Sequence, residues 1–468
     1  MDGKPEKLCL KAEVGLVGGL SLIAGVMIGS GIFMSPQTVL MNIGSPGASL
    51  LIWACSGVLS MLASLSYSEL GTLIQESGGE YIYILRTSGK LMAFVFVFSS
   101  VVVVRPASMT GVALSFAQNA VAPFYEDCMP PDIVVKCVAA VGILLLALIN
   151  CLSVRFAMAV NIFLLAAKSI ALLVISIGGV VMLIQGNTAN FQNAFEGTNY
   201  SISVIGLAFY QCLWSYDGWN NLNSVTEELK RPEVNLPRAI LIAIPVVTIL
   251  YLLVNVSYLA VMTPREMILS NAVAVTWGNK VLGSWGWVMS LAAALSSFGS
   301  LNGSFFSGGR VCFVAAREGH MPSILAMAHV RRLTPAPALI FTTIISLIVL
   351  IPGDFQGIIN FFSFTSWLFY GITISGLLYL KIKFPDLPRP YKVPIFIPIL
   401  VLLASVFLVL APIIDNPQME YLYVSLFILS GVFIYIPFIH YKVCPRLLDK
   451  LTVFLQLFLE VAPAEKNL

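Results

Sequence analysis

The sequence predicts an all-α polytopic membrane protein with twelve transmembrane helices. Of its 468 residues, 58% are hydrophobic and only 10% are charged, whereas about 25% of the residues in a soluble domain carry charge. Apolar runs long enough to cross roughly 30 Å of membrane hydrocarbon recur along the whole chain. This composition excludes the soluble enzyme classes. No metal, nucleotide or nucleophile motif is present, so we expect neither an enzyme nor a cofactor.

Each expected span is long enough to cross the hydrocarbon at a helical rise of about 1.5 Å per residue. Short polar or proline- and glycine-containing segments separate the spans. The twelve spans cover residues 14–40, 48–70, 92–118, 132–152, 157–184, 201–220, 237–261, 286–314, 334–352, 357–380, 393–414 and 420–440.

The distribution of basic residues predicts the orientation. With a cytoplasmic N-terminus, only Lys136, Arg265 and Lys280 of the 26 Lys and Arg residues fall in external loops. Cytoplasmic loops of membrane proteins carry the excess of positive charge. We therefore expect a cytoplasmic N-terminal tail at 1–13 and, after twelve spans, a cytoplasmic C-terminal tail at 441–468. The polar start runs directly into a long span, so we expect no cleavable signal peptide.

The first span carries poor helix formers near its middle, where residues 25–36 read GVMIGSGIFMSP. In lipid, an unwound backbone persists only where it lines a cavity within the protein, because its N–H and C=O groups need partners. Glycine lets a ligand approach the backbone, and a half-helix that begins there offers free N–H groups to a carboxylate. The alternative is that Gly25-x-x-x-Gly29 packs against another helix.

The sixth span is disturbed in a similar way. Residues 201–220 are rich in polar and aromatic side chains, and Asp217-Gly218 interrupts them. Disturbed helices at corresponding positions of two halves indicate a transporter with an inverted repeat and a site near the middle of the bilayer. We therefore expect two five-helix repeats and two additional helices, at 14–184, 201–380 and 393–440 respectively.

One of the eight cysteines differs from the others in its expected location. Seven fall in spans or on the cytoplasmic side, and only Cys128 lies in an external loop. A single thiol in an oxidising compartment indicates either an intermolecular disulfide or a free thiol.

A series of motifs resembles the amino acid–polyamine–organocation superfamily, and more narrowly the light subunits of heteromeric amino-acid transporters. The resemblance covers about residues 13–445. Two further segments, RRLTPAPALIF at 331–341 and FSFTSWLFYG at 362–371, resemble the branch that contains the system b-zero-plus light subunit and its aromatic-preferring paralogue. The main motifs are GSGIFMSP at 29–36, ESGGEY at 76–81, AFYQCLWSYDGWN at 208–220, TEELKRPEVNLPRAI at 226–240 and AREGHMPSIL at 316–325.

This resemblance implies a LeuT-type inverted repeat and sodium-independent exchange of amino acids by alternating access. The substrates would be neutral and dibasic L-amino acids, with cystine among them, or aromatic and large neutral ones in the alternative branch. It also implies a single-span glycoprotein heavy chain that is joined through Cys128 and brings the complex to the plasma membrane. In the b-zero-plus branch that membrane is the apical one of epithelia. Lipids are further partners, and nucleic acid is not expected.

A channel or a receptor is the alternative class of function. A channel would show a repeated pore helix or a ring of like charges, and a seven-span receptor has fewer helices. Neither pattern fits this sequence.

An amino-acid substrate presents a carboxylate, an ammonium and a side chain, so the site must bind all three. For the carboxylate we expect the backbone N–H groups at Ile28, Gly29, Ser30 and Gly31, with the Ser30 hydroxyl assisting. For the ammonium we expect backbone carbonyls of the segment from Phe209 to Trp214. The alternative for Ser30 is a small packing residue.

Two residues of the sixth span are candidates for substrate closure and selection. The resemblance implies that Trp214 is an aromatic lid, or gate, over the bound substrate; the alternative is a core aromatic residue. Asp217 would be a carboxylate near the middle of the bilayer, where charge is costly and rarely without function. It would attract the distal cation of lysine or arginine or the far end of cystine. The alternative is that Asp217 caps the broken backbone.

Two basic residues lie within expected spans. The resemblance implies that the Lys168 ammonium replaces the sodium ion that related transporters hold beside the first and fifth spans; the alternative is that Lys168 reaches the membrane interface. Arg105, followed by Pro106-Ala107, is expected to border the substrate pathway. The related light subunits carry a Lys-Pro-Thr pattern there, which leaves the substrate range open between the two branches.

The remaining candidates are weaker. Asn302 and the segment 363–367 are pocket, gate or packing residues. Glu227 and Glu228 are either a cytoplasmic charge latch or solvated surface. Residues 78–81 suggest a re-entrant loop after the second span.

Overall fold

The computed structural model describes residues 12, 14–332, 334–414 and 417–463. Most of the expected N-terminal tail and residues 464–468 of the expected C-terminal tail therefore lie outside the described residues. The α-helices are α1 (Leu16–Met27), α2 (Gly31–Ile43), α3 (Pro46–Leu73), α4 (Glu80–Ser88), α5 (Lys90–Ser99), α6 (Arg105–Val121), α7 (Asp132–Leu152), α8 (Val154–Ile184), α9 (Ile202–Ser215), α10 (Pro232–Val261), α11 (Pro264–Leu269), α12 (Val273–Val281), α13 (Trp287–Arg317), α14 (Ala336–Leu350), α15 (Phe355–Lys383), α16 (Phe396–Ile414), α17 (Met419–Tyr435) and α18 (Pro445–Leu459).

Shorter elements connect or extend these helices. Within the described part of the chain, two π-helical turns continue α5 and α17, and five 3₁₀ turns lie in the connections. They are η1 (Ser100–Val104) and η7 (Ile436–His440) of the π type, and η2 (Ala122–Phe124), η3 (Ala189–Phe191), η4 (Asn221–Glu228), η5 (Gly283–Trp285) and η6 (Ser323–Ala326) of the 3₁₀ type. Strands β1 (Met327–His329) and β2 (Val461–Pro463) pair antiparallel.

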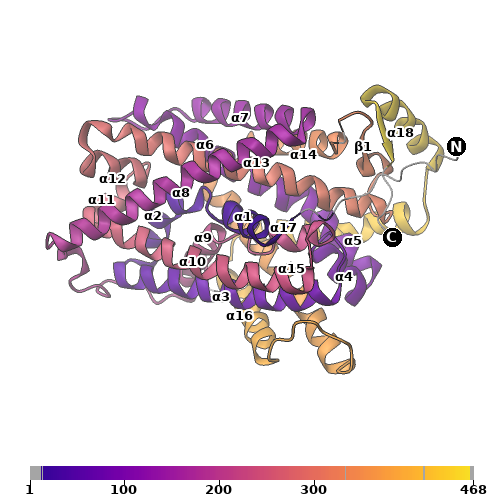
Figure 1. Cartoon of the computed structure of the whole chain (residues 1–468), viewed down its shortest axis with the longest axis horizontal. Coiled ribbons are helices and arrows are strands. Elements are labelled where there is room, and N and C mark those ends of the chain that lie inside the picture. The colour runs from indigo at the N-terminus through magenta and orange to yellow at the C-terminus, as the bar shows by residue number, and fades with distance from the viewer. Residues whose placement is uncertain (1–11, 13, 333, 415–416, 464–468) are drawn as a thin grey trace.

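The long helices lie side by side, roughly along the longest axis of the molecule (Figure 1). Over the described ranges, eight helices are long and apolar enough to cross a membrane, and the bent pair α1–α2 makes a possible ninth. The other expected spans are also helical: α9 and α14 are apolar but shorter, and α13 is long but rich in serine. The protein is thus a multi-pass helical membrane protein.

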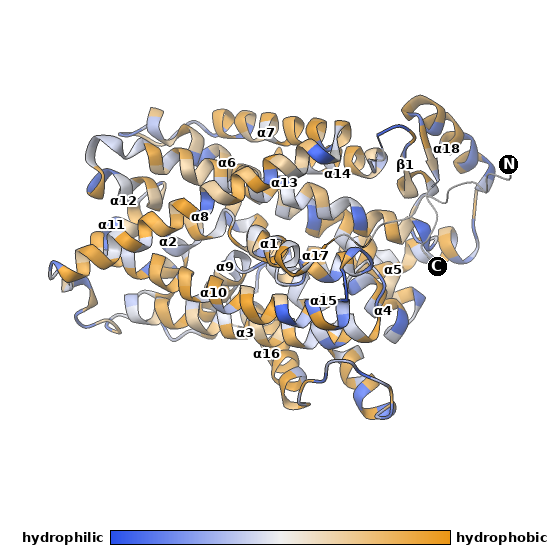
Figure 2. Ribbon diagram, in the orientation of Figure 1, coloured by the Kyte–Doolittle hydropathy of each residue, from blue (hydrophilic) through white to orange (hydrophobic). Residues whose placement is uncertain are grey.

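The packing places apolar side chains outside and many polar ones inside. Large apolar side chains such as Leu148 of α7 and Ile177 of α8 are more than half exposed, whereas Ser56, Ser60 and Ser64 of α3 are buried. Figure 2 shows hydrophobic residues along the lengths of the long helices and hydrophilic residues mainly towards their ends and in the loops. A surface of this kind is suited to lipid, which solvates the apolar exterior.

The predicted interruption of the first span is confirmed, and the α-helix of the sixth span ends close to the second predicted interruption. The first span breaks between Met27 and Gly31, and its two halves are bent by 44°. The sixth span ends as an α-helix at Ser215, and Gly218 adopts a φ of +107°, which favours glycine. Beyond this break the chain continues as the 3₁₀ segment η4 instead of a second α-helical half.

Ion pairs join η4 to the C-terminal part of α13. Glu228 pairs with Arg310 at 2.9 Å and Glu227 with Arg317 at 3.7 Å, and the two carboxylate side chains are only 14% and 12% exposed. The solvated-surface reading of these glutamates is therefore wrong. Their partners also lie far along the chain and are not the adjacent Lys230 and Arg231.

A short connection and a strand pairing hold the C-terminal segment against the bundle. Helix α18 begins five residues after η7 ends. Strand β2, which follows α18, pairs with β1 in the connection between α13 and α14, with Ala462 opposite Ala328. Much of the expected C-terminal tail is thus an ordered helix and strand beside β1 (Figure 1).

Candidate functional site

The two broken helices meet at their breaks. Gly31, the first residue of α2, lies so close to the end of α9 that a Cβ atom added to it would be 2.5 Å from the Cα of Ser215. A Cβ added to Gly218 would be 2.6 Å from Cγ1 of Val26, near the end of α1. Since real Cβ contacts essentially never fall below 3.0 Å, each glycine allows one broken chain to approach the other.

Side chains from other elements bind the carbonyl groups around the first break. The last carbonyl groups of a helix lack partners within that helix, and inside a membrane they must find others. Four carbonyls around this break, two of them in the last turn of α1, accept a hydrogen bond from a polar side chain. The donors and acceptors are Lys168 to Gly25, Tyr251 to Met27, Ser296 to Gly29 at 3.1 Å, and Asn221 to Leu22 at 3.3 Å.

Tyr251 of α10 joins the two breaks. Its hydroxyl is within hydrogen-bonding reach of the Met27 carbonyl and lies 2.9 Å from the Ser215 carbonyl. These two carbonyls mark the ends of α1 and α9. No sequence pattern distinguishes this residue, because the chain has 16 tyrosines and many polar side chains within apolar spans.

A small cavity lies between the breaks. Its volume is about 20 Å³, which is roughly the space of one water molecule. It brings together five of the seven predicted substrate-binding residues; Ile28 and Phe209 do not line it. The lining residues are Val26, Met27, Gly29, Ser30, Gly31, Ser108, Val112, Trp214, Ser215, Asp217, Ser300 and Ser304.

A second cavity of about 80 Å³ shares Asp217 with the first and contains charges of both signs. Glu80 and Asp217 contribute two carboxylates and Arg105 one guanidinium. The Tyr370 hydroxyl lies 3.5 Å from Oδ1 of Asp217, and the Asn220 amide donates to Glu80. We call these two cavities together the chamber. Arg105 lines it, and so does Glu80, which the sequence indicated only as part of a loop.

Apolar rings form another part of these walls. Phe362, Phe369 and Tyr370 line the larger cavity. Trp214, which lines the smaller one, is 6% exposed and makes an edge contact with Phe355 at 5.4 Å between ring centroids. Trp214 therefore has the core packing of the alternative reading and also faces the cavity between the breaks.

Lys168 of α8 contacts the backbone at the first break. Its side chain is fully buried, so the reading in which Lys168 reaches the membrane interface is wrong. Its ammonium donates to the Gly25 carbonyl, and it lines neither of the two chamber cavities. Lys168 therefore binds the broken backbone of α1 directly.

Two of the weaker candidates have structural contacts. Asn302 accepts a hydrogen bond from Asn150 at 2.9 Å and donates to the Ala157 carbonyl at 3.0 Å. The Ser363 hydroxyl donates to the Tyr210 carbonyl at 3.1 Å. This bond engages one carbonyl of the α9 segment in which we expected the ammonium acceptors.

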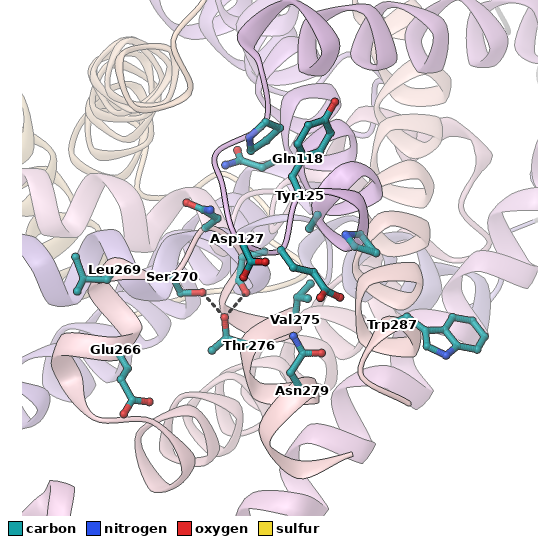
Figure 3. Close-up of a pocket in the computed structure, with 16 residues that line it drawn as sticks. Gln118, Tyr125, Asp127, Glu266, Leu269, Ser270, Val275, Thr276, Asn279 and Trp287 are labelled. Carbon is teal, nitrogen blue, oxygen red and sulfur yellow. Dashed lines mark hydrogen bonds between the residues drawn. The ribbon is translucent and has the colours of Figure 1, made fainter. Parts of the chain in front are cut away.

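A wider cavity of about 590 Å³ lies away from the breaks, between the end of α6, the α11–α12 segment and the start of α13. In Figure 3 the Ser270 and Thr276 hydroxyls are joined by a hydrogen bond of 2.6 Å, and Asp127 lies beside them. Asp127 and Pro130, which line this cavity, lie on either side of Cys128, an exposed free thiol. None of the residues at the two breaks lines it, so we do not assign it to the substrate.

A bundle of apolar helices in which two interrupted helices enclose a charged polar chamber defines a membrane transporter. Among the described residues there is no group of three or more His, Cys, Asp or Glu that could hold a metal ion. A family model described as amino acid permease matches residues 14–438. The chain belongs to the amino acid permease family, and it is a transporter and not an enzyme.

Several relatives are similar over nearly the whole chain. The b(0,+)-type amino acid transporter 1 of Homo sapiens is 50% identical over 466 residues, covering 99% of this chain and 96% of the relative. The cystine/glutamate transporter of Homo sapiens is 44% identical and covers 99% and 93%. The large neutral amino acids transporter small subunit 2 of Rattus norvegicus is 42% identical and covers 94% and 83%.

Proposed function

We propose that this protein is a sodium-independent exchanger of neutral and dibasic L-amino acids, cystine included, that works by alternating access. The observation that carries the proposal is the meeting of two broken helices, at Gly31 and Ser215, around a chamber with carboxylates and a guanidinium. The chamber cavities are far smaller than the roughly 300–1,000 Å³ of ordinary ligand pockets. Substrate binding therefore requires the chamber walls to move, as alternating access does.

The proposed architecture has twelve spans, with a LeuT-type inverted repeat at 14–184 and 201–380 followed by two helices at 393–440. Contacts between helices support it. In such a repeat each span of the first half has a counterpart five spans later. The first four spans all pack against their counterparts, in the pairs α2 with α9, α3 with α10, α6 with α13 and α7 with α14.

We assign binding of the substrate's carboxylate and ammonium groups to the breaks in the first and sixth spans. The N–H groups of Ser30 and Gly31, at the start of α2, have no partner within the helix and bind the carboxylate, with the positive end of the helix dipole behind them. Carbonyls near the end of α9 bind the ammonium. Trp214 closes the chamber as a lid, because its ring lies against the small cavity from α9.

The charges of the larger cavity favour dibasic substrates. Its two carboxyl groups outnumber its one guanidinium, and a substrate with one extra positive charge supplies a further cationic partner for them. Asp217 is the carboxylate common to both cavities. It is therefore the group best placed to hold the distal cation of lysine or arginine while the main-chain end occupies the breaks.

Asp217→Asn is expected to reduce arginine uptake about 10- to 100-fold, since a hydrogen bond to a charged group is worth about 1.5–3 kcal/mol. Leucine has no distal charge, so its uptake should fall much less. Uptake of both amino acids, normalised to the amount of transporter in the membrane, measures the difference. Equal losses for arginine and leucine would instead mean that Asp217 only caps the backbone of the break.

A second candidate function is exchange restricted to aromatic or large neutral amino acids. The rings of Phe362, Phe369 and Tyr370 in the cavity wall favour it, because aromatic pairs add favourable contact energy. Competition of labelled arginine uptake by tyrosine, leucine and cystine separates the two functions. Inhibition by all three supports the broad range, and absence of saturable arginine uptake supports the aromatic one.

Counterflow tests exchange itself. In proteoliposomes, efflux of labelled leucine should require an amino acid on the opposite side and should not change when sodium is replaced by another cation. Efflux into buffer without any amino acid at the same rate would overturn exchange and favour a channel.

We propose that Cys128 forms a disulfide with a single-span heavy chain. The thiol is exposed and free, and it lies beside the wide cavity lined by Asp127 and Pro130. A relative whose name includes small subunit supports an assembly with a second chain. The heavy chain would bring the complex to the plasma membrane, apical in epithelia, with both chain ends in the cytoplasm.

Cys128→Ser should abolish a heavy-chain adduct that is seen on a non-reducing gel and collapses on reduction. Cys137→Ser is the matched control, because Cys137 is also exposed but lies on the apolar helix α7. Coexpression in cells followed by electrophoresis with and without reductant measures the result. An adduct that persists in Cys128→Ser would assign the bridge to another residue.

A further inference from the structure

Helix α18 presents an unpartnered apolar stripe at the end of the bundle. Leu447, Leu451, Phe454 and Phe458 follow one another at helical spacing and are 70%, 54%, 64% and 73% exposed. The rings of Phe454 and Phe458 stack on each other at 6.2 Å. An apolar surface of this kind is unfavourable in water.

A neighbouring side of the helix already has a partner. Leu455 and Leu459 pack against the main hydrophobic core, and α18 lies against η6. The exposed stripe is therefore a second apolar face that the protein itself does not cover.

Both ends of α18 are tied to segments that adjoin apolar helices of the bundle. Its first residue, Pro445, is separated from the end of η7 at His440 by four residues, which extend over at most about 14 Å. Its other end leads into β2, which pairs with β1 shortly before α14 begins. With 15 residues, α18 is about 22 Å long and too short to cross the hydrocarbon. Helix α18 must therefore lie across the end of the helical bundle instead of spanning the membrane.

The charged residues on and beside α18 indicate which kind of surface the apolar stripe contacts. Arg446 and Lys450 lie on α18 and Lys442 just before it, whereas Asp449 is the only acidic residue of the helix. Basic residues beside an apolar stripe are typical of helices that lie on anionic lipid.

We propose that α18 is an interfacial helix whose apolar stripe is seated in the anionic cytoplasmic leaflet. The choice of leaflet depends on the orientation given under the proposed function. Because β2 ties α18 to β1, contact with the lipid surface also holds the connection between α13 and α14 at the membrane.

Hydrogen exchange tests this proposal on the full-length protein in nanodiscs of phosphatidylcholine with phosphatidylserine. Phe454→Asp should speed amide exchange of residues 447–459 about tenfold, because a charge in the stripe opposes insertion. Phe454→Leu is the matched control: it keeps an apolar side chain at the same position of the stripe and should leave exchange within about twofold. Wild-type exchange should also be faster in phosphatidylcholine alone.

Equal exchange in Phe454→Asp and the wild type would overturn the proposal. So would protection that requires two copies in one disc, or protection that appears only after cytosol is added, since these results identify another chain as the occupant. Exchange that is insensitive to phosphatidylserine would overturn the assignment to an anionic surface. The measurement does not depend on transport. Failure of this proposal can therefore be distinguished from failure of the exchange function in the counterflow test.

Discussion

Gly31→Ala is expected to abolish transport, whereas Gly25→Ala should leave it largely intact. A Cβ at Gly31 would lie 2.5 Å from the Cα of Ser215, a backbone atom that cannot move without shifting the end of α9. At Gly25 the nearest atom would be Cδ1 of Leu165 at 3.7 Å, which is ordinary van der Waals contact. Overpacking typically costs about 1–3 kcal/mol, and here the cost falls on the meeting point of both breaks.

The pair of variants also separates two readings of the glycine-rich first span. If Gly25-x-x-x-Gly29 were mainly a helix-packing motif, Gly25→Ala would be the damaging change. Counterflow, normalised to folded protein by size-exclusion chromatography in detergent, measures both variants. Transport by Gly31→Ala at the wild-type rate would contradict the close approach of the two breaks.

Lys168→Met is expected to lower exchange about 10- to 100-fold, because it removes a charged donor worth about 1.5–3 kcal/mol from the Gly25 carbonyl. Methionine keeps most of the length of the side chain and removes only the charge and the donor. If the ammonium takes the place of a sodium ion beside the first break, its loss disorganises the end of α1, where the substrate binds.

Lys136→Met is the matched control for this variant. Lys136 also donates to a backbone carbonyl, that of Ile351 at 2.8 Å, but in an exposed position far from the breaks. It should retain wild-type exchange. Counterflow of labelled leucine with and without sodium measures both variants. Unchanged exchange in Lys168→Met, or a sodium requirement in the wild type, would remove the proposed role.

The buried ion pairs illustrate what the sequence could not predict. We expected Glu227 and Glu228 to be a cytoplasmic charge latch or solvated surface, without a named partner, and they pair with Arg317 and Arg310 of α13. Glu69 of α3, which no motif had singled out, is fully buried and paired with Lys381 and Arg389 at 3.0 and 3.1 Å. These pairs join residues about 80 to 320 positions apart, and composition and spacing contain no information on which of many charges will meet.

The sequence by itself determined the class of fold, the long apolar helices among the described residues and the points at which the first and sixth spans leave the α-helix. These features depend on local properties: apolar length decides whether a segment can cross lipid, and glycine beside a polar residue decides where a helix can open. The family motifs also lie in continuous stretches, so Gly29, Ser30, Gly31, Trp214 and Asp217 could be selected in advance.

Only the tertiary structure decided how the two openings are held together and what surrounds them. The Tyr251 hydroxyl lies within hydrogen-bonding reach of the carbonyls at which α1 and α9 end, and the Lys168 ammonium donates to the Gly25 carbonyl beside the first break. Glu80 and Arg105 share one cavity with Asp217. The physical reason is that a freed carbonyl or a buried charge must be satisfied inside the membrane. Which side chain satisfies it is fixed by helix packing between distant parts of the chain.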